Sequence, residues 1–348
     1  MTGRLSRRAF GAIMGGLALT SAPRALAQQM EVVKVGLTNV ATDIGLFVAH
    51  KRGYFRDEGL DVQFTTFDSA ARMMAPFAAG EIDVSAGAPS AGFFNAVGRG
   101  IDMRIVADKV STPPGRPSQT LVVRKALVDS GRFKTLADLK GLKFANTAPG
   151  TAAWGTMYRI LDRAGLKPSD VDLVSLGFPQ QVIALANGAI DVALPAEPMT
   201  TEAVAKGYGV KVITDDEVFP GHQIAVIFYS GKFAKDRPHA GRKFMKAFLR
   251  GVRDHNDGLD DRGMFAGEKG EGIIAILNEY TSIKDPAFYR TFPLAFCNPD
   301  GTVNVDSIRE DYAAFKAAGF ITNDIDPAKG IDLSFLDAAL KELGPYRK

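Results

Sequence analysis

PFAAGEIDVSAGAPS, residues 76–90, and ALANGAIDVALPAEP, residues 184–198, share one pattern that decides the fold class. Each stretch reads as the end of a helix and a Gly, then Ile-Asp-Val and a strand of small residues that stops at a Pro-containing loop. Asp83 in the first stretch aligns with Asp191 in the second. The repeat predicts two halves built on one plan.

The segments upstream of the two stretches also match. VVKVGLTN, a helix and EGLDVQFTTF in the first half correspond to LKFANT, a helix and AGLKPSDVDLVSL in the second. Gly59 and Gly165 are 106 residues apart, and Gly80 and Gly188 are 108 apart. Coincidence is the alternative, because Gly often follows a helix. Alternation of strand and helix signals over 31–228 predicts an α/β fold with mostly parallel sheets.

Two segments could pass between the halves, IDMRIVADKVSTPPGRPSQTLVVRKA and HQIAVIFYSGKF. We therefore expect a discontinuous first lobe, residues 31–121 and 228–348, and a second lobe, residues 122–227. Beyond Arg237 the chain reads as helices that pack around the first lobe.

The first 27 residues read as an export signal. Three Arg precede an apolar run of about a dozen residues, and Ala25-Leu26-Ala27 forms an A-x-A cleavage site before Gln28. The run is too short and too rich in Gly for a permanent membrane anchor. Residues 6–10, SRRAF, resemble the core of twin-arginine signals. We expect a soluble protein exported to the periplasm in the folded state.

Composition argues against several function classes. The chain has 42 basic and 39 acidic residues, but four Arg and no acid lie in the signal, so the mature chain is close to neutral. No basic block remains to suggest nucleic acid or an anionic membrane as partner. Cys297 is the single Cys, and the four His show no metal-ligand spacing. We expect no metal and no cofactor.

Four loops follow strands, at residues 38–43, 87–90, 146–152 and 195–198. In open α/β sheets ligands lie beyond the carboxyl ends of the strands. If the two lobes face each other, all four loops can meet in one cleft.

The first two loops offer hydroxyl, amide and carboxylate groups. Thr38, Asn39, Thr42 and Asp43 could hydrogen-bond a ligand, although Thr42 or Asp43 could equally cap the following helix. In the second loop we single out Ala88 together with Ser90. The Ser90 hydroxyl stands at the start of a helix, where a simple cap would look the same.

The last two loops complete the candidate set. FANTAPGTAAWGT, residues 144–156, runs from a strand into a helix, so Gly150, Thr151 and Ala152 could present free N–H groups to an anion. Thr151 could instead be an ordinary N-cap. Trp154 could stack on a ligand or pack in the core. Glu197, beside Pro198, is a carboxylate in a rigid loop that we expect to touch a ligand.

A hydrolase is a weaker alternative. APSAG, residues 88–92, is one residue away from the G-x-S-x-G nucleophile motif. The second half has the same turn with Glu197 in place of Ser, as expected if the turn serves a shared fold.

The succession of VGLTNVATDIGLFVAHKRGYFRDEGLDVQF, AAGEIDVSAGAPS, LKGLKFANTAPGTAAW and ANGAIDVALPAEP resembles the periplasmic solute-binding proteins of nitrate, sulfonate and taurine uptake systems. These proteins share a fold with thiamine-pyrimidine-binding proteins, and the resemblance covers nearly all of the mature chain. It implies a type II periplasmic-binding fold, a ligand enclosed between two lobes, and delivery to the membrane permease of an ABC importer by a monomer.

By matching position, the resemblance implies ligand contacts from 38–43, 88–90, 150–152 and Glu197. Family members often have an aromatic residue where this chain has Ala196. The resemblance therefore leaves the identity of the ligand open. We expect backbone N–H groups and hydroxyls to hold a small organic anion, a sulfonate or an aromatic or aliphatic carboxylate, with Arg72, Lys109 and Arg116 within possible reach. A neutral heterocycle is the alternative. The enzymes on this fold, the pyrimidine synthases, carry a Cys-rich iron motif that one Cys cannot provide.

Overall fold

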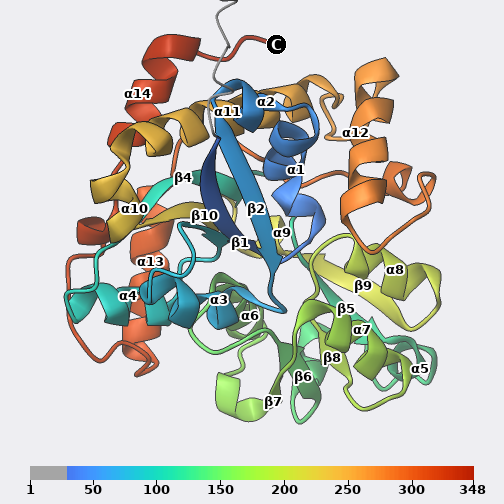
Figure 1. The fold of residues 1–348 in the computed structure, drawn as a ribbon. Coiled ribbons are helices and arrows are strands. Elements are labelled where there is room, and N and C mark those ends of the chain that lie inside the picture. Colours follow the sequence, from blue (N-terminus) through green and yellow to red (C-terminus); the bar gives the residue numbers. More distant parts are fainter. Residues whose placement is uncertain (1–29) are drawn as a thin grey trace, which may run out of the picture.

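The computed structural model describes residues 30–348 and contains two five-stranded sheets (Figure 1). The predicted signal peptide, residues 1–27, lies outside the described residues. The first sheet has the order β2-β1-β3-β10-β4, and the second has the order β7-β6-β8-β5-β9. Helices flank both sheets, so the predicted α/β fold class is confirmed.

The strands follow the predicted alternation. Their bounds are β1 Glu31–Leu37, β2 Leu60–Thr66, β3 Val84–Gly87, β4 Met103–Thr112, β5 Thr120–Arg124, β6 Lys143–Asn146, β7 Asp172–Ser175, β8 Val192–Ala193, β9 Gly209–Thr214 and β10 His222–Ser230.

The helices between residues 30 and 218 are mostly short connections between strands. Their bounds are α1 Ile44–Lys51, α2 Tyr54–Asp57, α3 Ala70–Ala78, α4 Ala91–Gly98, α5 Lys125–Asp129, α6 Ala152–Arg163, α7 Phe178–Ala186, α8 Met199–Ala205 and α9 Asp215–Val218. The remaining helices are α10 Gly231–Asp236, α11 Pro238–Asp257, α12 Gly267–Tyr280, α13 Val305–Ala317 and α14 Ser334–Leu343.

The two sheets repeat one pairing scheme. β1 runs parallel to β2 and β3, as β6 does to β7 and β8. In each sheet one antiparallel strand, β10 or β5, then pairs with the third strand and with the last one. Because the order of pairing is the same, the carboxyl ends of corresponding strands lie at corresponding edges.

The repeated Asp residues have the same structural role in both halves. One carboxylate oxygen of Asp83 accepts the backbone N–H of Lys34 (2.9 Å), and one of Asp191 accepts that of Lys143 (3.1 Å). Each Asp also forms an ion pair with an Arg, Arg237 for Asp83 and Arg124 for Asp191. The sequence repeat thus marks equivalent points, where the third strand of each sheet begins beside the first.

The chain passes between the sheets twice, at residues 113–119 after β4 and at residues 215–221 before β10. All of β10 pairs with the first sheet, so the expected lobe boundary at 227/228 lies inside this strand. The buried carboxylate of Asp215 joins the two segments. It accepts the backbone N–H of Ser118 (3.0 Å) and that of Gln119 (2.9 Å).

We expect Asp215 to make the stability of the protein fall as the pH rises. Burial raises the pKa of Asp215 from 3.8 to about 8, although three backbone N–H groups oppose that shift. Between these two pKa values the folded protein keeps a proton that the unfolded chain has lost. The free energy of unfolding therefore falls with rising pH, by at most about 1.4 kcal/mol per pH unit for one group.

Urea denaturation of the wild-type protein and of Asp215→Asn between pH 5 and 8 measures this slope. The wild-type slope should be the more negative one. Asp108 is buried too, with a pKa raised to about 7, and it is present in both proteins. Equal slopes would show that Asp215 titrates alike in the folded and unfolded chains.

Large aromatic side chains fill the core between the first sheet and the helices α11, α12 and α14 (Figure 1). Phe47 of α1 and Phe244 and Phe248 of α11 are almost fully buried there. A second cluster runs from the other face of the first sheet through Phe93 and Phe94 of α4 to the second sheet. The sheets are therefore linked by a continuous apolar contact beside the crossing segments.

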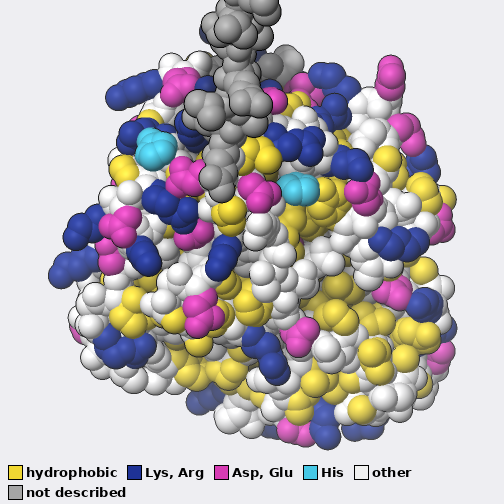
Figure 2. Space-filling model, in the orientation of Figure 1, with side chains coloured by type: hydrophobic (Ala, Val, Ile, Leu, Met, Phe, Trp, Pro, Cys, Tyr) yellow, Lys and Arg dark blue, Asp and Glu magenta, His cyan; other side chains and the backbone are white. Residues whose placement is uncertain are grey.

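The surface drawn in Figure 2 carries Lys and Arg side chains interspersed with Asp and Glu. Apolar side chains gather at the lower right, where α7 and α8 lie in Figure 1. Ile183 of α7 is the most exposed large apolar side chain of the described residues, at 63%. No helix within residues 30–348 is long and apolar enough to cross a membrane.

Candidate ligand-binding site

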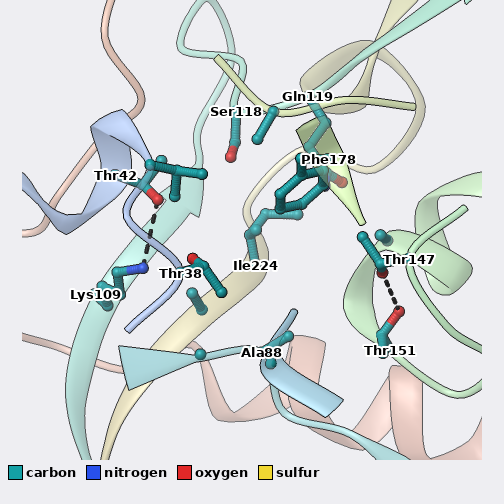
Figure 3. A pocket seen from close by; sticks show the side chains of 16 residues that line it. Thr38, Thr42, Ala88, Lys109, Ser118, Gln119, Thr147, Thr151, Phe178 and Ile224 are labelled. Atoms are coloured by element: carbon teal, nitrogen blue, oxygen red, sulfur yellow. Dashed lines mark hydrogen bonds between the residues drawn. The ribbon is translucent and has the colours of Figure 1, made fainter. Parts of the chain in front are cut away.

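A small cavity lies between the two sheets, at the carboxyl ends of their parallel strands (Figure 3). Its volume is about 60 Å³, well below the roughly 300–1,000 Å³ of pockets for drug-sized ligands. All four predicted loops, the crossing segment 113–119 and the start of β10 contribute to its wall. The lining residues are Thr38, Val40, Thr42, Ala70, Gly87, Ala88, Lys109, Ser118, Gln119, Thr147, Thr151, Ala153, Phe178, Ala196, Ile224 and Ala225.

The two sides of the cavity touch each other directly. The backbone N–H of Ala91, at the start of α4, donates to the carbonyl oxygen of Gly150 (2.7 Å). Ser90 and Thr151, the N-caps of α4 and α6, pair across the same junction as an antiparallel bridge. The two sides are therefore in direct contact beside the cavity.

One buried cation, Lys109 of β4, stands at the edge of the cavity and is 3% exposed. Its Nζ lies 2.6 Å from Asp43 Oδ1 and 3.4 Å from Thr42 Oγ1 (Figure 3). An ammonium group has three N–H donors, and no third partner is present among residues 30–348. Lys109 therefore keeps one donor for a ligand while its charge is balanced by Asp43.

Thr147 and Thr151 form a hydroxyl pair on the opposite side in Figure 3, with their oxygens 3.3 Å apart. Thr151 Oγ1 donates to the Ala148 carbonyl oxygen (2.9 Å) and accepts the backbone N–H of Trp154 (3.3 Å). Thr151 is thus an N-cap of α6 and a wall residue at once. Thr147 has the freer hydroxyl of the two.

Gln119, a lining residue, has a buried side-chain oxygen that lacks a partner in the described part of the chain. It is 2% exposed, and its Oε1 is buried without a hydrogen bond from any of residues 30–348. The backbone around it is fixed, because Asp215 holds its N–H and Gln119 also pairs with Ala196. A buried acceptor left unpaired is uncommon in folded proteins and is most easily explained by a missing partner.

Apolar groups make up the remaining wall. Val40, Phe178 and Ile224 line the cavity together with several Ala residues. The cavity therefore has a few fixed polar points on an apolar surface, which is the usual make-up of a small-molecule site.

Four of the predicted residues line the cavity, namely Thr38, Thr42, Ala88 and Thr151. Asp43 lies behind Lys109, and its second carboxylate oxygen accepts the N–H of Val40 (3.0 Å), so it also caps the turn before α1. That these residues contact a ligand remains a prediction.

Other predicted residues cap a helix or pack in the core instead. Ser90 Oγ accepts the N–H of Phe93 (3.2 Å) and caps α4. Trp154 packs in the core, where it stacks on Tyr158 and meets Phe320 edge to face. The cavity wall of α6 comes from Ala153 instead.

Glu197 is also directed elsewhere. Its carboxylate accepts the backbone N–H (3.0 Å) and the hydroxyl (2.9 Å) of Thr201, and it pairs with Lys211 (3.2 Å). The N–H of Thr201 belongs to the first turn of α8, where a carboxylate is favoured by the helix dipole. Ala196 lines the cavity in its place.

The three other predicted positions are adjacent to the wall. Asn39 has a left-handed backbone, with φ of 58°, and lies between the lining residues Thr38 and Val40. Gly150 makes the direct contact with Ala91, and Ala152 precedes Ala153.

Sequence reasoning missed Ser118 and Gln119, in the crossing segment 113–119, and Ile224, in β10 just after the other crossing segment. A signal was available: a segment that joins two facing lobes must pass the floor of the cleft. Of the three cations considered, only Lys109 lines the cavity. Arg72 lies in an adjoining groove of about 310 Å³ that shares Thr147 with it, and Arg116 donates to the Leu294 carbonyl oxygen (2.9 Å).

The cavity has no evident catalytic pair. Lys109 is the one titratable side chain among the lining residues, and within residues 30–348 no group of three or more His, Cys, Asp or Glu could hold a metal. Cys297 is buried, and burial raises the pKa of its thiol to about 12.

The sequence model of the NMT1-like family matches residues 27–257. This chain belongs to the NMT1-like family. No curated protein matches it.

Solved structures show the same architecture for this NMT1-like chain. The alkanesulfonate-binding protein SsuA of Xanthomonas axonopodis pv. citri, bound to MOPS, has a TM-score of 0.69 at 18% identity, over 87% of this chain and 99% of that one. The periplasmic nitrate-binding protein NrtA of Synechocystis PCC 6803 has a TM-score of 0.73 at 15% identity, over 91% and 90%.

An enzyme is among the similar structures. The desulfurization enzyme DSZB has a TM-score of 0.58 at 14% identity, over 90% of this chain and 99% of that one. These likenesses confirm the predicted type II periplasmic-binding fold, and at such identities they show the fold alone.

Proposed function

We propose that this NMT1-like protein is an extracytoplasmic solute-binding protein. It captures a small organic anion, a carboxylate or sulfonate, between its two halves and delivers it to an ABC importer. The observation that carries the proposal is the cavity between the sheets, lined from all four strand-end loops, from the crossing segment 113–119 and from β10. The SsuA and NrtA structures, which are described as sulfonate- and nitrate-binding, support it.

The polar groups of the cavity favour an anion. Lys109 keeps a free N–H donor, and the first turn of α6 brings backbone N–H groups close to the wall at Ala153. The small volume favours an aliphatic acid over an aromatic one.

A neutral ligand is the second candidate, because Asp43 balances the charge of Lys109 at 2.6 Å. An anion would give the buried site a net negative charge, which costs free energy unless hydrogen bonds offset it. A small neutral heterocycle would keep the site neutral.

An enzymatic role has little support in the cavity. Ser90, the predicted alternative nucleophile, has its hydroxyl in the cap of α4, and no His lines the wall. Nucleophilic catalysis needs a base within hydrogen-bond reach of the nucleophile. Incubation with candidate substrates tests this, since turnover without an importer would contradict a pure binding role.

We further propose that the protein has two lobes. Their boundaries lie in the crossing segments at 113–119 and 215–221, a few residues before those expected from the sequence. In this proposal the protein is a monomer in the periplasm, exported through the twin-arginine signal. An exported chain that begins at Gln28, read by N-terminal sequencing, would support the export step. The membrane permease of an importer is the partner.

A thermal-shift screen tests the ligand class, since a ligand that binds only the folded protein stabilises it by about 2.7 kcal/mol at a hundredfold excess over its Kd. Small carboxylates and sulfonates should raise the Tm of the purified protein by several degrees. Pyrimidines and nitrate serve as comparison ligands.

Thr151→Leu should abolish the shift, because Thr151 lines the cavity and the larger Leu side chain would occupy part of it. Thr135→Leu is the matched control, since the exposed Thr135 precedes the turn Leu136–Leu139 and lies outside the wall. A shift produced by neutral heterocycles and never by anions would replace the anion proposal with the second candidate.

A further inference from the structure

Gln119 and Lys109 give the cavity two separate polar ends. In Figure 3 Gln119 reaches in from the top beside Phe178, whereas Lys109 and Thr42 lie on the other side. Val40 and Ile224 belong to the apolar wall. A ligand that satisfies both ends must therefore have two polar groups joined by a short apolar link.

The unpartnered amide of Gln119 sets the chemistry of its end. A buried carbonyl oxygen without a donor is unfavourable, so a ligand group that donates to it gains more than the same group would in water. A side-chain amide offers an acceptor and a donor in fixed positions. A hydroxyl can match it in either orientation because it both donates and accepts.

The end at Lys109 sets the other group. The third N–H of the ammonium and the Thr42 hydroxyl lie together, and both can donate to an oxyanion. Asp43 pairs with the ammonium group and fixes its position.

We propose that the ligand is a small hydroxy acid, whose carboxylate or sulfonate binds at Lys109 and Thr42 and whose hydroxyl binds Gln119. Gln119 is then the residue that determines specificity for the hydroxyl. This inference rests on the proposed capture of an organic anion and names its chemical class.

Matched ligand pairs test the inference, each differing only in a terminal hydroxyl: 3-hydroxypropionate against propionate, and 2-hydroxyethanesulfonate against ethanesulfonate. Isothermal titration calorimetry measures the Kd of each with the wild-type protein, Gln119→Met and Gln63→Leu. Gln63 is exposed on β2 and provides the matched loss of an amide outside the cavity.

The wild-type protein and Gln63→Leu should bind the hydroxylated member of a pair more tightly, by roughly ten- to a hundredfold. Gln119→Met should lose most of that preference and keep its affinity for the plain acid. Gln119→Ala provides a second variant if the Met side chain does not fit, and circular dichroism verifies that each variant folds.

Equal affinities for the two members of each pair in the wild-type protein, with measurable binding of both, would overturn the hydroxyl inference and leave the anion proposal standing. The same holds if Gln119→Met retains the full preference. If no acid binds while neutral heterocycles do, the anion proposal and the hydroxyl inference both fall.

Discussion

Replacing Lys109 with Met should lower the free energy of unfolding by about 3–5 kcal/mol, because the change leaves Asp43 as an uncompensated buried charge. Both side chains are almost fully buried, at 4% exposure for Lys109 and 0% for Asp43. Removing both charges in Asp43→Asn/Lys109→Met should restore much of the loss. Urea denaturation of the two single variants and the double variant measures this cycle.

Lys51→Met is the matched control. Lys51 pairs with Glu279 at 2.6 Å, but its side chain is 48% exposed, so the loss should stay below about 1 kcal/mol. A loss of the same small size at Lys109 would mean that water reaches the buried pair. The double variant also separates stability from function: it should fold well and still fail to bind small acids.

Gly150→Ala should weaken ligand binding about tenfold or more, because the added Cβ obstructs the closed form. An ideal Cβ at Gly150 lies 2.6 Å from the Cβ of Ala91, and the backbone φ of 65° disfavours any residue except Gly. The clash exists only when the halves are together, so the open form should gain population. Calorimetry measures the affinity, and small-angle X-ray scattering measures the opening.

Gly165→Ala separates the clash from the backbone cost. Gly165 has a φ of 70°, close to that of Gly150, yet nothing lies within 4 Å of its ideal Cβ. This control should lose about 1 kcal/mol of stability and keep its affinity. Equal affinities for both variants would mean that the Ala91 contact contributes nothing to closure.

The segments of the site could be predicted from sequence because strand ends in an α/β repeat have a fixed place. Each of the four predicted loops supplies the wall, through Thr38, Ala88, Thr151 and Ala196 among others. The repeat at Asp83 and Asp191 was enough to align the two halves.

The individual side chains were harder to predict, and several differ by one position. Ala196 lines the cavity where Glu197 was expected, and Ala153 where Ala152 was. Turns that lead into helices have no periodicity from which to read the direction of a side chain. Glu197, for example, accepts a backbone N–H from the first turn of α8, the helix that follows it.

The segments of Gln119 and Ile224 could have been suspected, but these two side chains could not be singled out because their role depends on contacts between distant segments. Gln119 is placed by Asp215, 96 residues further along the chain. Lys109 was within the considered set, but its buried partner Asp43 lies 66 residues earlier, and sequence reasoning assigned that Asp to the ligand.

The position of β10 has a consequence for synthesis. The five strands of the second sheet come from one continuous stretch that ends at Thr214, whereas the first sheet needs residues 222–230 between β3 and β4. A nascent chain emerging from the ribosome can therefore complete the later half first, while the N-terminal strands wait for a missing neighbour. If the chain is exported in the folded state, as we propose, pairing of that late strand must precede export.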